Sequence, residues 1–508
     1  MRRPLRDRLM VAGSVISAAL IVGALAACAP PPGQTTGGDT VTLGVVGNTK
    51  DTIYPYSSQN SPSNNALWAQ MYDGLTYLDN EGGVQMALAE SMTPNADDTV
   101  WTIHLRPGVK LHSGRTFGAD DVIYSVTKML DPKSAYTPST QINMVDPNGI
   151  TKVDDLIVQM KLTRPYGPFP SAWSSDRLVM VGKDWTEQNP DGTGPFTVDA
   201  FTPGQEGTFT KFDGYYGQKP NFKHLRLVYF QDQPAITNAL RGGQIDIAFT
   251  VPFTDVTTLR ASPGIKILES ESAGYLIFEM RLDVPPFTDP RVREAFRLIV
   301  DRDQIAKNAF GGYARPANDY LGNNTPCPPP AVPQRTQDIA RAKQLLAEAG
   351  QTNISVELPT DAAFPGMLEA AQLFAQQAAQ AGVTVTVRKM DGAAFLNKWL
   401  QWPFLVGYSS SPYFITATSH FAPAGEENAT HFDDPEYNRL STQLYATSDQ
   451  RKQCDAITQM QRIEHERGGD IVPIYPKQLI AYNERVQGLR PDLYGRGSFE
   501  FRGVSLTP

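Results

Sequence analysis

The chain of 508 residues is acidic, with a formal net charge of −8, and 41% of its residues are hydrophobic. A chain of this length can bury the cores of two or three ordinary domains. It contains no basic block that could neutralise the phosphates of a nucleic acid, and this argues against the nucleic-acid-binding classes.

The N-terminus has the pattern of an export signal. Four arginines precede an uncharged, mostly apolar run from Leu9 to Ala27, and the sequence LAAC ends at Cys28. This sequence resembles the bacterial lipobox, in which the cysteine is acylated and the chain is cut before it. We therefore expect residues 1–27 to be a lipoprotein signal peptide and Cys28 to be a lipid anchor at the outer face of the cytoplasmic membrane. An uncleaved membrane anchor and an ordinary secreted protein are the alternatives.

A disordered tether is predicted at residues 28–39, because Pro and Gly without apolar periodicity cannot bury enough surface to become ordered. Removal of residues 1–27, which carry four Arg and one Asp, would change the net charge from −8 to −11. No second run that is both uncharged and predominantly apolar reaches the ~18 residues that a membrane span needs. We therefore expect an acidic extracytoplasmic body that does not cross the membrane.

The first half of this body shows strand and helix patterns in alternation. Residues 40–47 predict a buried strand, and a polar loop at 54–67 leads into a helix predicted at 68–75. Apolar and polar residues alternate over 98–105, which predicts a half-buried strand. Residues 118–130 have helical spacing, with two aspartates near the positive helix N-terminus.

The second half continues the alternation. A strand is predicted at 243–249, and a long amphipathic helix is predicted at 289–310, with Asp289 as N-cap and Pro290 as its first residue. The strand, helix and strand patterns at 353–359, 366–382 and 383–390 imply a parallel pair of strands joined by a crossover helix. The fold class is therefore α/β, and two sheets are expected.

Three stretches then resemble one family, the extracytoplasmic solute-binding proteins of peptide and nickel ABC importers (family 5). They are residues 88–130, 192–249 and 274–317, and shorter matches follow at 342–350 and 434–440. Each motif is weak alone, but their order and spacing together are specific. Residues 41–484 are largely covered by the resemblance.

The resemblance implies a two-lobed, periplasmic-binding-protein-like fold of class II that closes on its ligand about a hinge. Lobe I would comprise 40–270, with an added subdomain near 86–189, and lobe II would comprise 271–477, with 478–508 returning to lobe I. The hinge segments would lie near 272–280 and 471–482. The implied function is that of a monomeric binding protein without a cofactor, which captures peptides between the lobes and delivers them to an ABC permease and its ATPase.

Other functions are less well supported by motifs. Two histidine pairs, His104 with His112 and His420 with His431, are candidate metal ligands, but no further Cys or carboxylate ligand stands at recognisable spacing, so no metal is expected. Glu464-His465-Glu466 lacks the second His of a metalloprotease helix. No nucleophile elbow and no phosphate-binding loop are present, which argues against an exported hydrolase. A surface sensor or scaffold with the same fold is an alternative class.

The aromatic-rich segment 395–421 bears on the ligand. In peptide-binding relatives a Trp in the corresponding region is followed by an Asp that meets the ligand's α-ammonium group. Here the match is 408–413, and it contains no acidic residue. An ammonium group needs an opposing charge when it is buried, so a neutral Ser/Tyr pocket better suits amides, hydroxyls or a blocked amine. Oligosaccharides or sugar conjugates, and a metal chelate, are therefore alternatives to peptides.

A ligand pocket is expected where residues 54–65 and 404–421 meet, as the resemblance implies. Neutral hydroxyls and aromatic faces, without a carboxylate, dominate both segments, so binding should depend weakly on an α-ammonium group. The residues expected to line it are Asn60, Ser61, Tyr275, Tyr408, Ser409, Ser410 and Tyr413.

Two cysteines remain once Cys28 is assigned to the lipid. Cys327 and Cys454 both fall in the span expected for lobe II, and an oxidising exterior permits them to pair. We therefore predict a disulfide between them.

Overall fold

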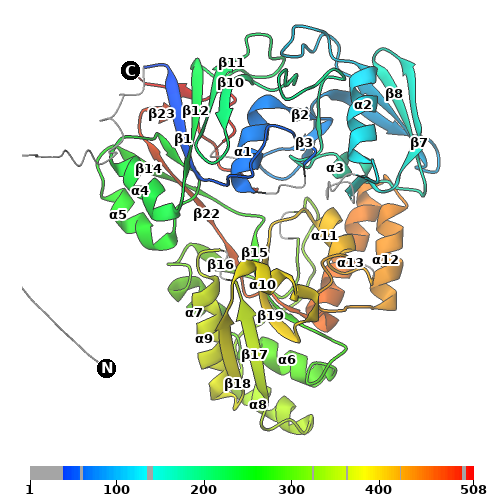
Figure 1. Ribbon diagram of the computed structural model, residues 1–508. Coiled ribbons are helices and arrows are strands. Elements are labelled where there is room, and N and C mark those ends of the chain that lie inside the picture. The colour runs from blue at the N-terminus through cyan, green and yellow to red at the C-terminus, as the bar shows by residue number, and fades with distance from the viewer. Residues whose placement is uncertain are drawn as a thin grey trace, which may run out of the picture. The chain divides into compact units, whose positions relative to one another are not determined.

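The computed structural model describes residues 38–57, 61–133, 141–322, 325–361, 364–423, 425–494 and 499–507 (Figure 1). The largest sheet has seven strands, and its centre is β1, which is parallel to both of its neighbours. This sheet is mixed, because the remaining pairs are antiparallel. In spatial order the strands are β10 (Phe196–Thr202), β11 (Glu206–Lys211), β12 (His224–Phe230), β1 (Thr40–Val46), β13 (Ile247–Ala248), β22 (Gln478–Asn483) and β14 (Ile265–Ser270).

A separate four-stranded antiparallel sheet lies within residues 89–162. The alternation of Trp101, Ile103 and Leu105, all buried, confirms the half-buried strand predicted there. Helix α2 (Ala119–Met129) contacts two strands of this sheet, and Val122 and Val126 are buried. The spatial order is β5 (Ala89–Pro94), β6 (Val100–Leu105), β8 (Ile157–Leu162) and β7 (Val145–Asp154).

A third sheet is built around the fully buried strand β15 (Tyr275–Met280), which pairs with β19 (Phe404–Ser409) and β20 (Asp470–Ile471). Beside it, β17 (Ser355–Thr360) and β18 (Thr384–Lys389) are parallel and joined by α9 (Met367–Gln380). This confirms the predicted strand, helix, strand unit. Phe278 stacks on Phe374 of α9, with 4.9 Å between ring centroids, so the two elements share one apolar core.

The chain passes between the largest sheet and the third sheet twice. It leaves β14 and enters β15 across residues 271–274, and it returns from β20 by way of β21 (Ile474–Pro476), which lies outside the third sheet, to β22 across Lys477. Fixed connections of this kind can act as a hinge, because few residues must change conformation when two bodies rotate. The lobe boundaries at 270, 271, 477 and 478 remain our proposal.

Two predicted helices differ from the structure. The helix expected over 289–310 is broken into α6 (Pro290–Ile299) and α7 (Arg302–Asn308), because Asp301 caps α7 by accepting from the Gln304 N–H at 2.8 Å. Asp289 and Pro290 start α6 as predicted. The helix expected at 68–75 is α1 (Pro62–Met71), which begins inside the predicted loop.

The other helices complete the layers around the sheets. They are α3 (Phe169–Ala172), α4 (Gln233–Arg241), α5 (Val256–Arg260), α8 (Ile339–Glu348), α10 (Gly392–Leu396), α11 (Tyr413–Ser419), α12 (Pro435–Tyr445) and α13 (Gln450–Arg467). Short two-stranded pairings join β2 (Asp73–Gly74) to β9 (Val179–Met180), β3 (Thr76–Leu78) to β4 (Val84–Met86), β16 (Ala314–Pro316) to β21, and β23 (Val486–Gln487) to β24 (Ser505–Leu506).

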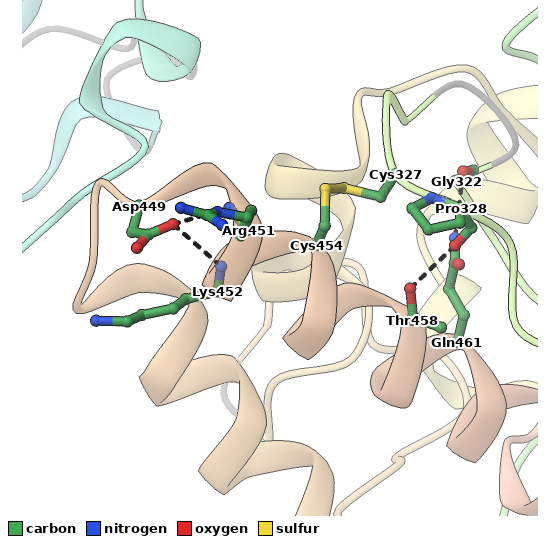
Figure 2. Close-up of a disulfide and its surroundings, with 9 residues drawn as sticks. All are labelled: Gly322, Cys327, Pro328, Asp449, Arg451, Lys452, Cys454, Thr458 and Gln461. Atoms are coloured by element: carbon green, nitrogen blue, oxygen red, sulfur yellow. Dashed lines mark hydrogen bonds between the residues drawn. A yellow bond between two sulfur atoms is a disulfide. The ribbon is translucent and has the colours of Figure 1, made fainter.

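The expected disulfide is present and fixes a loop onto α13 (Figure 2). The Cα atoms of Cys327 and Cys454 are 5.0 Å apart, within the range that a disulfide needs. Farther along the same helix, the Thr458 hydroxyl donates to the Pro328 carbonyl at 2.9 Å, and the Gln461 amide donates to the Gly322 carbonyl at 3.2 Å. Residues 325–328 are thus held by covalent and hydrogen bonds together.

Candidate functional site

The main cavity has a volume of about 1360 Å³ and is lined from two parts of the chain. One part, which we call the first wall, lies before the first chain crossing at residues 271–274. The other, which we call the second wall, comes mostly from the loops and helices between that crossing and the second one at Lys477. Its aromatic and polar lining includes Asn65, Trp101, Gln141, Asn143, Tyr166, Ser171, Ser174, Trp399, Ser410, Ser411, Tyr413, Phe414, Gln450 and Tyr494. Its volume exceeds the ~300–1,000 Å³ of ordinary small-molecule sites, so it has room for an extended ligand.

Direct contacts join the two walls beside this cavity. The rings of Tyr166 and Tyr445 stack with centroids 5.1 Å apart, and the Gly167 N–H donates to the Tyr445 carbonyl at 2.7 Å. A Cβ atom at Gly167 would lie 1.8 Å from the carbonyl oxygen of Thr447. Helix α3 also contacts α11. These contacts hold the walls together, and they depend on the absence of a side chain at Gly167.

Charged groups of both signs line the cavity. Arg164 and Arg177 belong to the first wall, and Asp176 lies beside them. Glu426 and Glu427 belong to the second wall, and the Ser419 hydroxyl donates to Glu427 at 2.9 Å. This cavity therefore contains carboxylates, although the segments 54–65 and 404–421, from which a pocket without carboxylates was expected, have none. Its acidic residues come from other segments.

Two of the residues expected at the pocket, Ser410 and Tyr413, line the main cavity. Tyr413 also donates its hydroxyl to Glu464 at 2.6 Å, and Tyr437 donates to the same carboxylate at 3.2 Å. Burial raises the pKa of Glu464 to about 7, although these hydroxyls and the Leu321 N–H lower it. The ring of Tyr413 is thus held at the cavity wall by the hydrogen bond of its hydroxyl to a buried carboxyl group.

The other expected residues are not among those lining this cavity. Tyr275 is 1% exposed, and its hydroxyl bonds to Ser409 and Thr416. Tyr408 stacks on Phe364 at 3.8 Å between centroids and bonds to the Ser272 side chain.

Of the two residues expected from the first wall, Ser61 caps a helix, and Asn60 is not described by the structure. Ser61 is the N-cap of α1, where its oxygen accepts from the Asn64 N–H at 3.1 Å and its hydroxyl donates to Asp51 at 2.7 Å. Its neighbour Asn65 lines the cavity. Asn60 lies outside the described residues.

Several cavity residues were missed by sequence reasoning. Arg164, Tyr166 and Arg177 belong to a connection between β8 and β9 (Val179–Met180), and they carry no motif that marks a site. Trp399 lies in the aromatic-rich segment, whose composition could have identified it. A single sequence shows which residues are aromatic or charged, but not which of them face a shared cavity.

The two histidine pairs are not brought together as metal sites among the described residues. His112 contacts the Gly194 carbonyl at 3.0 Å, and His431 contacts Asp283 at 3.1 Å. His420 lies instead with Glu279 and Asp470, with its Nε2 2.9 Å from Asp470 Oδ2.

These three side chains form a buried cluster beside the main cavity. They are 1% (Glu279), 3% (His420) and 2% (Asp470) exposed. Burial raises the pKa of Glu279 to about 8, despite the lowering influence of His420. For His420, burial lowers the pKa, but Asp470 and Glu279 outweigh it and raise the value to about 9. The cluster therefore concentrates ionisable groups in the core.

No helix among the described residues combines the length and apolar character that are needed to cross a membrane. The predicted signal peptide, Cys28 and most of the tether fall outside the described residues. Their assignment remains a prediction from the sequence.

The known proteins that this chain resembles are solute-binding proteins. The family model for bacterial extracellular solute-binding proteins, family 5 (middle region), matches residues 83–418. Glutathione-binding protein GsiB of Pectobacterium atrosepticum is 27% identical over 80% of this chain and 83% of its own. Di/tripeptide-binding protein 2 of Pseudomonas aeruginosa is 27% identical over 86% of this chain and 88% of its own. The ABC transporter substrate-binding protein CtaP of Listeria monocytogenes has a TM-score of 0.82 at 21% identity, covering 93% of this chain and all of that one.

Proposed function

Because this chain belongs to family 5 of the bacterial extracellular solute-binding proteins of ABC importers, we propose that it captures short peptides in the main cavity. The observation that carries the proposal is the large cavity between two walls, with Arg164 and Arg177 on one wall and Glu426 and Glu427 on the other. Binding between two bodies can bury most of a ligand, and their separation releases it.

The chemistry of the lining supports a peptide in particular. Arg164 and Arg177 can pair with a terminal carboxylate, since guanidinium groups bind carboxylates through paired hydrogen bonds. Glu426 and Glu427 can neutralise an α-ammonium group, which would otherwise be costly to bury. Tyr and Trp side chains provide apolar contact for peptide side chains with little loss of entropy. The related proteins named for glutathione and for di- and tripeptides bind ligands of this class.

The proposed cellular role follows from the family and the N-terminal pattern. Family 5 proteins are extracytoplasmic, and a lipid on Cys28 would hold this protein at the outer face of the cytoplasmic membrane, close to a permease. The protein would then deliver the peptide to that permease as a monomer. Its role is binding, since the relatives are binding proteins.

Titration of trialanine into the protein by calorimetry tests the proposal and the role of closure. We expect the wild type to bind with a Kd on the order of micromolar or tighter. We expect Gly167→Ala to bind at least ~10-fold more weakly, because its Cβ would collide with the Thr447 carbonyl when the walls meet. Its unfolding temperature should be unchanged.

Gly392→Ala is the matched control, since the nearest atom to a Cβ at Gly392 is 4.0 Å away, on Asp361. Its affinity should equal that of the wild type. The proposal is wrong if the wild type binds neither trialanine nor other tripeptides. The role of Gly167 is wrong if its alanine variant binds as tightly as the wild type.

A further inference from the structure

We propose that Glu279, His420 and Asp470 form a buried site for a divalent metal ion of the zinc type, distinct from the main cavity. The ligand atoms of the three side chains all lie within 4.8 Å of one another. No other group of three His, Cys, Asp or Glu residues meets this condition in the part of the chain that the structure describes. The proposal does not depend on the nature of the peptide.

The fold places these three residues together by strand register. Glu279 of β15 lies directly opposite Asp470 of β20, and His420 is the C-cap residue of α11. Side chains alternate along a strand, so Glu279 projects from the same face as Tyr275 and Ile277, both of which pack in an apolar core. A carboxylate in this position needs a partner, because an unpaired buried charge is strongly unfavourable.

Strand β19 leaves space for the carboxylate. Gly407 has no side chain, and a Cβ atom there would lie 2.8 Å from Oε2 of Glu279. A larger residue at this position would require the Glu279 carboxylate to shift. The absence of a side chain at Gly407 thus leaves room for the Glu279 carboxylate in an otherwise apolar region.

The distances suit a metal ion. His420 Nε2 lies 2.9 Å from Asp470 Oδ2 and 3.7 Å from Glu279 Oε1. Two ligands that are each ~2.1 Å from zinc in tetrahedral geometry lie roughly 3.4 Å apart. The observed separations bracket that value, so shifts of a few tenths of an ångström would place an ion among the three groups.

Unsatisfied oxygens are the second, independent indication. Both carboxylate oxygens of Glu279 and Oδ1 of Asp470 are buried and accept no hydrogen bond of normal geometry, and a further polar group, the Trp399 side chain, acts on Glu279 as a hydrogen-bond donor. Most buried polar atoms in proteins have a partner, and exceptions require an explanation. A neutral imidazole and two carboxylates together balance the charge of a divalent cation, and all three are ordinary zinc ligands.

The residues around the cluster also favour a cation, and they connect the cluster to the main cavity. Glu427, which lines the main cavity, acts electrostatically on both His420 and Glu279 as a third negative charge. Ser419 and Trp399 line the same cavity, so His420 follows directly on a residue of the cavity wall. An ion could reach the cluster from the cavity during opening of the two walls.

Zinc retention tests the site. Full-length protein stripped with EDTA is incubated with ZnCl₂, passed through a desalting column and analysed by mass spectrometry for zinc. We expect one zinc per chain and a rise in unfolding temperature that EDTA reverses. His420→Ala and Glu279→Gln should each retain at least ~10-fold less zinc, while His431→Ala should retain as much as the wild type, because His431 contacts Asp283 at a separate place.

Cobalt absorption of the wild type provides a second measurement that does not rely on a variant's folding. A cobalt-loaded site of low coordination number should show intense visible bands, and these should disappear when zinc is added. The proposal is overturned if stripped wild type retains no zinc, if its cobalt spectrum is that of the free hydrated ion, or if folded His420→Ala retains as much zinc as the wild type.

Discussion

Replacement of Asp319 by alanine is expected to destabilise the protein by about 3 to 5 kcal/mol, because it leaves a buried arginine without its counter-charge. The Asp319 carboxylate is fully buried and accepts from Arg302 at 2.6 Å and from Arg335 at 2.6 Å. It also accepts from the Val472 N–H at 2.9 Å. Denaturant unfolding of the wild type and Asp319→Ala measures the loss, which appears as a lower midpoint.

Glu357→Ala is the control for this experiment. Glu357 and Arg388 form an exposed pair at 3.5 Å, and exposed pairs contribute about 0 to 1 kcal/mol. A loss below ~1 kcal/mol in Asp319→Ala would contradict the prediction.

The same network predicts a dependence on pH. Burial would raise the pKa of Asp319, but Arg302, Arg335 and Arg297 outweigh it and hold that pKa below its usual value. A lowered folded-state pKa contributes stability that is present above the unfolded value of ~3.9 and is lost as the pH falls through the folded value. The stability difference between wild type and Asp319→Ala should therefore shrink in strong acid.

Removal of the Cys327–Cys454 disulfide is expected to cost about 3 to 5 kcal/mol of stability. The bridge closes a sequence separation of 127 residues, and cross-links of this length restrict the unfolded chain strongly in the chain-entropy model. Both cysteines also line the main cavity, so ligand affinity should fall as well. Unfolding of the double variant Cys327→Ser/Cys454→Ser measures the first effect, and calorimetry with trialanine measures the second.

A reducing agent separates the bond from the substitutions. Reduced wild type should match the double variant, and the double variant itself should not respond to reduction. Equal denaturation midpoints for the wild type and the double variant would contradict the prediction.

Local signals in the sequence were sufficient for much of the fold. Asp289 and Pro290 start α6 because a capping carboxylate followed by proline is a strong helix signal. The strand, helix, strand unit of β17, α9 and β18 followed from hydrophobic spacing. The break after Ile299 was missed, because the helical apolar spacing continues through it and Asp301 becomes a cap only when the chain turns.

The candidate site was less predictable, because its residues come from distant segments. In the run from 408 to 413, Tyr408 and Ser409 belong to β19, whereas Ser410 follows its end and reaches the cavity. The sequence alone does not show where that strand stops. Glu279 carried a usable signal, a single acidic residue in the otherwise apolar strand YLIFEM, but its partners became visible only in the register with β20.

Native mass spectrometry of the protein purified from its own host tests the central claim, that the main cavity holds a peptide, most directly. We predict a bound mass that is released on denaturation and yields amino acids on acid hydrolysis. The bound mass should be lost from Gly167→Ala prepared in the same way, because closure of the walls retains the ligand. A bound ligand that yields no amino acids, such as a sugar conjugate or a metal chelate, would contradict the claim.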